Sequence, residues 1–382
     1  MKRTRTQGLA LLVFLLPPMA ANADSVTGGT DDAGISDFEG PSDKTVAIVG
    51  VVGLPDMNGN GRAEVGVVRT LPGDRVEVII RDSDTKQLVN TVEFVGTGLD
   101  LVDVTAVDDV SGEGIPELAA LFRHPDGPAV VQVKDAASGT LFNRLRFFGK
   151  EWDVKAITSF DSNYRDEGDE SFRPDIGVLA SRKDGTSVTV QARDVDYGLQ
   201  VERIQFPADP AREYRDVTTL IDLEGSITPF VSSLSVLPDG RAKVDSIFLL
   251  SGSQDTIGLG KDLSALGASA IAVAGLDDST DNLSPDVAVL WRKSNGQGLV
   301  QVRDVFGSRQ SQMQFFGGEW HVVDMAGLPY LSFGPYLAWA GRIAVLAVRD
   351  DGTEVAVQIR YTGSGEANNW ISFGNLAAER PN

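Results

Sequence analysis

Three stretches of the chain place oxygen-bearing side chains at the close spacing that a cation site requires. The first is a nine-residue loop in which acids and amides alternate with other residues, at Asp56, Asn58, Asn60 and Glu64. Glycines between them allow the sharp turns that direct these side chains to one centre. Because Ca²⁺ takes about six to eight oxygen ligands, the spacing predicts a calcium loop with a structural rather than a catalytic role.

Two further loops repeat this spacing less faithfully, with Asp109, Ser111, Glu113 and Glu117 in one and Asp278, Thr280, Asn282 and Asp286 in the other. The third loop has lost both glycines. In all three the last acid stands at loop position 9 and an apolar, strand-like run follows, whereas an EF-hand loop is longer and leads into a helix. A solvated turn is the alternative for each loop, because Asp, Asn and Gly favour turns for backbone reasons.

The residue types give little support for any other chemistry. The chain has no cysteine, which excludes disulfides, thiolate metal sites and a cysteine nucleophile. Its two histidines, His124 and His321, have no nucleophile or second ligand at useful spacing, and we expect both at the surface. Trp291, Trp339 and Trp370 do not recur along the chain, so they are candidate aromatic contacts for a ligand.

The elements that must position these loops are repeated. Residues 147–154, Phe-Phe-Gly-Lys-Glu-Trp-Asp-Val, return at 315–322 with six of eight positions matched. A second segment of the form Val-Gln-x-basic-Asp recurs at 131–135, 190–194 and 300–304. Together these anchors define six units of about 55 residues over 45–376, a period typical of propellers and solenoids.

Each unit holds four short apolar or alternating runs separated by turn residues, and none holds a convincing amphipathic helix. Four strands per unit predict an all-β fold, a β-propeller of about six four-stranded blades, with seven blades as the alternative count. A β-solenoid fits less well because its turns are shorter. The stretch 35–40 resembles a fourth strand, so the leader 24–44 either helps to close the ring or is flexible, and 377–382 form a tail.

On these loops and units the sequence resembles the FG-GAP or VCBS-type repeat family of β-propellers, the integrin-like calcium-loop repeats. The resemblance covers roughly 45–376. It implies that the loop between the first two strands of a blade binds Ca²⁺, and the first loop matches the family pattern position by position, with Glu64 in place of the final Asp. Units three, four and six depart from the pattern, by an insertion or by loss of the last acid.

The first 23 residues have the form of a secretory signal peptide. A basic start precedes the apolar run 8–16, and a small-residue cleavage site ends at Ala23. No later run is long enough to predict a transmembrane helix, and without a cysteine there is no lipoprotein anchor. We therefore expect a periplasmic or secreted chain beginning at Asp24.

The composition of the chain limits which classes of partner it is expected to bind. A formal net charge of −20 and a pI near 4.5 argue against nucleic acid. The hypothesis that follows is an exported, non-enzymatic scaffold whose loops bind a protein or glycan partner, with Ca²⁺ in some of them. The alternative is a secreted or periplasmic enzyme, a lyase or hydrolase, with its site in the central channel.

Overall fold

The apolar runs of the sequence form strands throughout the part of the chain that the computed structural model describes. Those residues are 46–161, 174–220, 230–249, 252–264, 267–276, 285–305, 309–328, 341–362 and 364–376. The predicted signal peptide, the leader with its possible closing strand at 35–40, and the tail from 377 lie outside these ranges. Within them no helix is long and apolar enough to cross a membrane.

The described strands make six sheets, each of four antiparallel strands in chain order, called blades 1 to 6. Blades 1 and 2 are β1 (Ala47–Leu54), β2 (Glu64–Leu71), β3 (Arg75–Asp82), β4 (Leu88–Val95), and β5 (Asp100–Val107), β6 (Glu117–Arg123), β7 (Ala129–Asp135), β8 (Leu141–Phe147). Blades 3 and 4 are β9 (Trp152–Asp161), β10 (Pro174–Arg182), β11 (Val188–Asp194), β12 (Gln200–Phe206), and β13 (Glu213–Leu220), β14 (Phe230–Val236), β15 (Ala242–Phe248), β16 (Gln254–Leu259). Blades 5 and 6 are β17 (Ser269–Leu276), β18 (Asp286–Arg292), β19 (Gly298–Asp304), β20 (Arg309–Phe315), and β21 (Trp320–Leu328), β22 (Arg342–Arg349), β23 (Val355–Tyr361), β24 (Ala367–Gly374).

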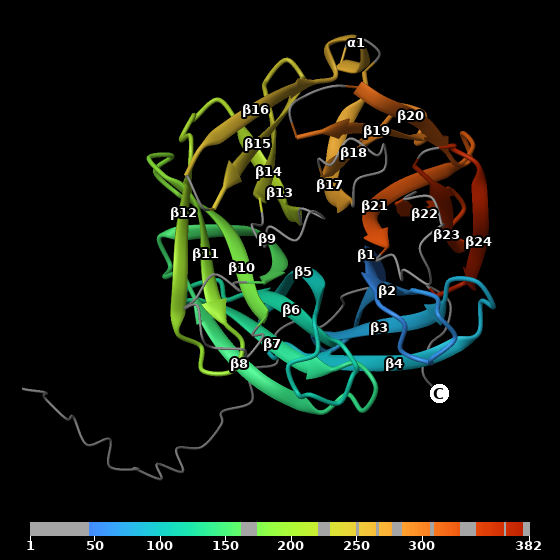
Figure 1. Cartoon of the computed structure of the whole chain (residues 1–382), viewed down its shortest axis with the longest axis horizontal. Coiled ribbons are helices and arrows are strands. Elements are labelled where there is room, and N and C mark those ends of the chain that lie inside the picture. Colours follow the sequence, from blue (N-terminus) through green and yellow to red (C-terminus); the bar gives the residue numbers. More distant parts are fainter. Residues whose placement is uncertain are drawn as a thin grey trace, which may run out of the picture. The chain divides into compact units, whose positions relative to one another are not determined.

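The blades are arranged in a ring around a central channel (Figure 1). The first strand of each blade lies innermost, in contact with the first strands of both neighbouring blades. The fold is therefore the predicted β-propeller, with six blades rather than seven. The only helix in the described residues is the single turn α1 (Lys261–Ser264), which lies between blades 4 and 5.

Strand position within a blade explains the apolar pattern of the sequence. Second strands are covered by the neighbouring blades on both faces, and seven of the eight residues in β2 and all but the last residue of β6 are buried without alternation. Fourth strands at the rim alternate, as in β8, where Leu145 and Phe147 are buried and their neighbours are exposed or half-buried. Burial between blades holds the ring together, because each side of a sheet removes the apolar surface of the next from water.

A β-bulge interrupts the first strand of every blade at the same place. In β1 the register shifts between Ile48 and Gly50, and in β5 it shifts between Leu101 and Asp103. The other four first strands carry the same shift. A bulge redirects the residue that follows it, so one residue from each blade is presented at one level of the channel.

Candidate functional site

The loop of blade 1 is built around the carboxylate of Asp56. Its Oδ1 atom accepts hydrogen bonds from the backbone N–H groups of Asn58 (3.1 Å), Gly59 (2.8 Å) and Asn60 (3.2 Å), and its Oδ2 from Gly61 (2.7 Å). Both glycines have a φ of 78°, a conformation that other residues rarely adopt. Asp56, Asn58 and Asn60 thus lie together as the sequence predicts.

Glu64, the last acid of that loop, begins β2 and is completely buried. Its Oε2 atom accepts a hydrogen bond from Met57 N at 2.9 Å, whereas its buried Oε1 atom has no hydrogen-bond partner among the described residues. Directly opposite Glu64 in the β2–β3 ladder stands Asp82, which accepts hydrogen bonds from the side-chain amides of Asn58 (3.1 Å) and Asn60 (2.5 Å). Asp82 is therefore part of this site. Sequence reasoning missed it, although the recurring basic–acidic pair at the end of third strands marks its position.

The two opposed acids of blade 1 have very different proton affinities. Burial, with repulsion from Asp56 and Asp82, raises the pKa of Glu64 to about 8. Burial also opposes ionisation of Asp82, but hydrogen bonds from Thr85, Asn60 and Asn58 outweigh it and lower the pKa of Asp82 to about 2. At neutral pH a proton on Glu64 thus relieves the repulsion between the two carboxyls, and a cation in that place would relieve it equally well.

The loop of blade 2 has the same construction with weaker ligands. Asp109 accepts N–H groups from Gly112 (2.8 Å), Glu113 (3.2 Å) and Gly114, and the hydroxyl of Ser111 at 3.1 Å. Glu117 accepts from the backbone of Val110 and Ser111, so both of its oxygens are satisfied. The Glu113 residue is exposed and contributes only its backbone N–H.

The opposition of two acids, here called the acid pair, recurs in four blades. In each, an acid at the first or second position of the second strand faces the acid that ends the third: Glu64–Asp82, Glu117–Asp135, Asp175–Asp194 and Asp286–Asp304. All eight side chains are buried. Blade 4 places Phe230 opposite Phe248 at this position, with ring centroids 4.9 Å apart, and blade 6 places Arg342 opposite Tyr361.

These observations show which features of the loops favour a bound cation and which do not. The unsatisfied buried oxygen of Glu64 and an all-oxygen donor set suit Ca²⁺ in blade 1. Within the described ranges, however, no three or more His, Cys, Asp or Glu side chains form a group that could hold a metal ion. Of the predicted residues in blade 5, Asp286 belongs to its acid pair, while Asp278, Thr280 and Asn282 lie outside the described residues.

The channel carries a second set of carboxylates. The residue after the bulge is Asp103 in blade 2, Asp216 in blade 4 and Asp324 in blade 6, whereas blades 1, 3 and 5 have Gly50, Ala156 and Ala272 there. Each aspartate accepts a hydrogen bond from a backbone N–H of the next blade, namely Ile157 (3.0 Å), Val273 (2.7 Å) and Val51 (2.9 Å). The three carboxylates therefore link the blades in pairs, 2 with 3, 4 with 5 and 6 with 1.

Burial raises the pKa of all three channel carboxyls. Repulsion adds to the effect for Asp103, whose pKa lies well above its ordinary value, and for Asp216, whose pKa rises to about 7. The pKa of Asp324 rises to about 6, because burial outweighs its hydrogen bonds from Val51 and Met325. Asp216 and Asp324 therefore titrate near neutral pH, yet all three carboxyls are alike and are bound to the backbone.

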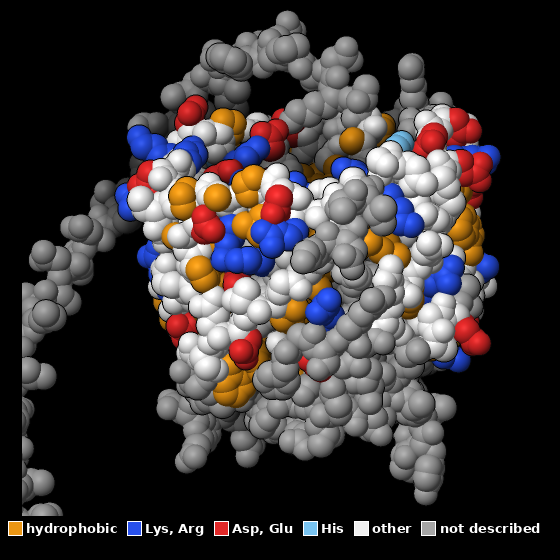
Figure 2. Space-filling model, turned by 90° about the horizontal axis from the view of Figure 1, so that it is seen from above, with side chains coloured by type: hydrophobic (Ala, Val, Ile, Leu, Met, Phe, Trp, Pro, Cys, Tyr) orange, Lys and Arg blue, Asp and Glu red, His pale blue; other side chains and the backbone are white. Residues whose placement is uncertain are grey.

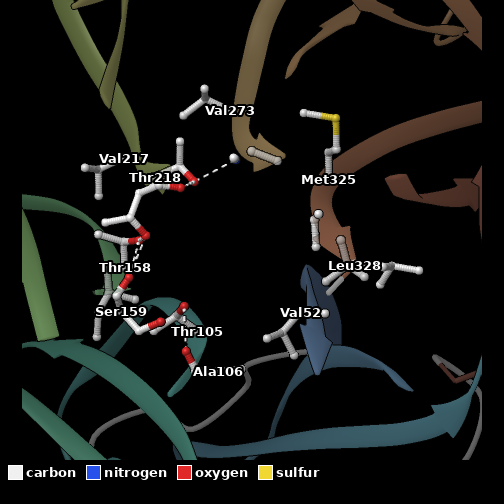
Figure 3. A pocket seen from close by; sticks show the side chains of 18 of the residues that line it. Val52, Thr105, Ala106, Thr158, Ser159, Val217, Thr218, Val273, Met325 and Leu328 are labelled. Atoms are coloured by element: carbon white, nitrogen blue, oxygen red, sulfur yellow. Dashed lines mark hydrogen bonds between the residues drawn. The ribbon is translucent and has the colours of Figure 1, made fainter. Parts of the chain in front are cut away.

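The channel cavity, of about 340 Å³, has two unlike walls (Figure 3). Blades 2, 3 and 4 line it with hydroxyls such as those of Thr105, Thr158 and Thr218, whereas Val52, Met325 and Leu328 face it from the other side. On the hydroxyl-poor side the backbones meet closely: a Cβ on Gly53 would lie 2.2 Å from the carbonyl oxygen of Gly327. Among the described lining residues, the polar side chains are acids and hydroxyls only.

A third region lies between blades and was missed as a site by sequence reasoning. The repeated Phe-Phe-Gly-x-Glu-Trp segment lines a cleft between blades 2 and 3 (the 2/3 cleft), and its second copy lies at the junction of blades 5 and 6 (the 5/6 junction). In both, the second Phe has a positive φ, 35° at Phe148 and 57° at Phe316. In both, its N–H donates to a glutamine of the next blade, Gln191 at 3.4 Å and Gln358 at 3.1 Å.

The 2/3 cleft is a cavity of about 360 Å³ whose lining includes Phe148, Trp152 and three arginines. The rings of Phe148 and Trp152 are half-buried and lie 5.0 Å apart. At the 5/6 junction the ring of Trp370, 37% exposed, packs against the buried rings of Phe316 (5.1 Å between centroids) and Trp320 (5.3 Å). Trp370 is thus accessible, and its contact with a ligand stays a prediction.

The expectation for Trp291 is wrong. Its side chain is completely buried and belongs to the core between blades 4 and 5, where its ring packs against Gly260. The absence of a repeat at this position reflects that local packing rather than ligand contact. Trp339 lies outside the described residues. Both histidines are exposed, as predicted, and His321 lies 3.2 Å from Asp350.

No family model matches the sequence, and no curated protein sequence matches it closely enough to be a relative. Solved structures do match the fold. The fucose-specific lectin from Aleuria aurantia has a TM-score of 0.51 at 13% identity, covering 86% of this chain and 95% of the lectin. AofleA from Arthrobotrys oligospora has a TM-score of 0.55 at 10% identity, covering 86% of this chain and 89% of that protein. At these identities the likeness establishes the propeller fold.

Proposed function

We propose that this chain is an exported, non-enzymatic propeller that binds a glycan, with Ca²⁺ stiffening the loops of some blades. The observation that carries the glycan part is the 2/3 cleft, where the half-buried rings of Phe148 and Trp152 lie beside hydrogen-bonding groups. The exposed ring of Trp370 lies at the equivalent 5/6 junction. Aromatic faces suit the apolar faces of sugar rings, and neighbouring polar groups suit their hydroxyls. The fold likeness to a fucose-specific lectin supports the same proposal.

The test is binding of the intact chain to an array of defined glycans, compared with a variant carrying Trp152→Ala and Trp370→Ala. Loss of the bound signal in the variant, with an unchanged thermal midpoint, is the expected result. Tyr197→Ala is the matched control, because Tyr197 is an exposed aromatic (65%) at a rim turn. If the chain binds a protein and none of the glycans, the partner is a protein rather than a glycan.

The calcium part of the proposal concerns the first two loops. Asp56 and Glu64 in blade 1, with Asp82 as an added ligand, and Asp109 and Glu117 in blade 2 would hold the ion. Its chemistry there would be to neutralise carboxylates that the fold places against one another. We assign the loops no catalytic step.

Export also remains part of the proposal, resting on the signal-like residues 1–23. The intact mass of the secreted chain should correspond to a start at Asp24, and retention of Met1 after export would contradict it.

The rival function is an enzyme with its site in the channel, favoured by the raised pKa values of Asp103, Asp216 and Asp324. We prefer a structural role for them, because each carboxylate is bound to backbone N–H groups across a seam between blades. Turnover of a glycan that Asp216→Asn abolishes without loss of binding would reverse that preference.

A further inference from the structure

The 2/3 cleft concentrates positive charge in a strongly acidic chain. Three guanidinium groups, those of Arg146, Arg193 and Arg203, line it together with one carboxylate, Glu151, although the chain as a whole has a net charge of −20. On the face seen in Figure 2, acidic and basic side chains lie next to one another instead. A local excess of arginine against the overall charge points to an anionic ligand.

Two of these arginines contact aromatic rings and a backbone carbonyl rather than a carboxylate. Arg203 lies over the ring of Trp152 at 5.3 Å, and Arg193 lies over the ring of Phe147 at 5.5 Å while donating to Gly198 O. Within the described part of the chain, none of the three forms an ion pair with a carboxylate. Stacking on aromatic rings holds a guanidinium in place while its remaining N–H groups can bind a ligand.

The 5/6 junction shows that the geometry does not demand this charge. The position of Arg203, opposite Gln191, is taken there by Trp370, opposite Gln358. The position before the first Phe of the segment, which is Arg146 in the 2/3 cleft, is a glutamine at the 5/6 junction. Both places keep the same positive-φ Phe and the same glutamine contact. The fold of this segment therefore does not require the two extra arginines.

We propose that the 2/3 cleft binds an acidic sugar residue, whose carboxylate or sulfate group is held by Arg146 and Arg203 while its ring lies against Phe148 and Trp152. This rests on the proposed glycan-binding function and specifies its ligand class. Guanidinium pairs with such anions by two parallel hydrogen bonds. The overall negative charge does not prevent it, because physiological salt screens charges beyond about 8 Å.

The experiment is calorimetric titration of the intact chain with four oligosaccharides of equal length: an oligogalacturonate, its methyl ester, a sulfated galactan and the neutral galactan. We expect the acidic pair to bind at least about tenfold more tightly than the neutral pair, since charge-assisted hydrogen bonds to Arg are the stronger ones. Stronger binding of either the uronate or the sulfate identifies the anionic group.

Arg146→Gln with Arg203→Gln should remove that preference, whereas Arg241→Gln should not, because Arg241 pairs with Asp239 in an exposed turn of blade 4. Thermal midpoints of all variants serve to show intact folding. Equal binding of neutral and acidic sugars, or equal loss in the Arg241 variant, would overturn the acidic specificity and leave glycan binding standing. Failure of all four sugars, together with an empty glycan array, would remove the proposed function itself.

Discussion

Blades 1 and 4 place opposite kinds of side chain at the same backbone position. At the start of the second strand and the end of the third, blade 1 opposes Glu64 and Asp82, and blade 4 opposes Phe230 and Phe248. The two rings stabilise their ladder by direct contact at 4.9 Å. Two buried carboxylates at that position destabilise it unless a proton or a cation lies between them.

The difference shows that one backbone position can hold either two rings, which pack without a further partner, or two acids, which need a proton or a cation. Blade 6 offers a third arrangement, because Arg342 brings a positive charge to the position of the first acid. If two opposed acids need a counter-charge at this position, a blade without one should carry other side chains there, and blades 4 and 6 carry rings or a cationic side chain. Three experiments, in decreasing order of expected effect, test this comparison.

The largest effect concerns pH. The pKa of Glu64 is about 8 in the folded chain and about 4.3 in the unfolded chain, so between these values only the folded chain keeps the proton. Its contribution to stability is complete below the lower pKa and is lost as pH rises toward 8, with a slope approaching about 1.4 kcal/mol per pH unit.

Urea unfolding at pH 5 to 8 with a chelator present should therefore show a shallower decline for Glu64→Gln than for the unmutated chain. The three channel aspartates, whose pKa values are also raised, act in the same direction in both proteins and cancel in the difference. Parallel stability profiles would mean that Glu64 is ionised in the folded chain without metal.

The next effect is the introduction of an acid into blade 4. Phe230→Glu removes a ring contact and places an unpaired carboxylate against Phe248 at a half-buried position, which should lower the free energy of unfolding by about 2 kcal/mol, because the charge is partly desolvated. Phe230→Leu, as the control, should cost about 1 kcal/mol. Denaturant midpoints measure both, and similar costs for Glu and Leu would show that this position tolerates charge.

The smallest effect is that of calcium. Affinity should be on the order of 10⁻⁴–10⁻³ M, as in other extracellular modules, and about ten times the dissociation constant should stabilise the folded chain by about 1.4 kcal/mol. Affinity should rise with pH, because Glu64 must release its proton to bind the ion.

Asp56→Ala combined with Asp109→Ala should abolish most of the calcium-induced rise in Tm, while Asp239→Ala, at an exposed turn, should leave it unchanged. Calorimetry that detects no heat of binding at millimolar Ca²⁺ would identify both loops as plain turns.

From the sequence alone, the positions of the strands could be predicted to within a few residues. In blade 2 the apolar or alternating runs of the sequence at 102–107, 117–122, 129–134 and 141–148 coincide with the strands Asp100–Val107, Glu117–Arg123, Ala129–Asp135 and Leu141–Phe147. Strand periodicity, turn residues and a regular repeat are local properties, so they can be read without knowing any distant contact. The Asp56 loop could be recognised for the same reason, since the hydrogen bonds that the Asp56 carboxylate accepts join residues no more than five positions apart.

Only the tertiary structure decided which residues meet across the ladder and around the ring. Asp82 stands 18 positions from Glu64 and became its partner through strand register, and Asp324 reaches Val51, 273 positions away, only because the ring closes. The burial of Trp291 likewise depended on Gly260 in the connection before its own blade. Such contacts arise from closure and packing of whole blades, and no local pattern in the sequence encodes them.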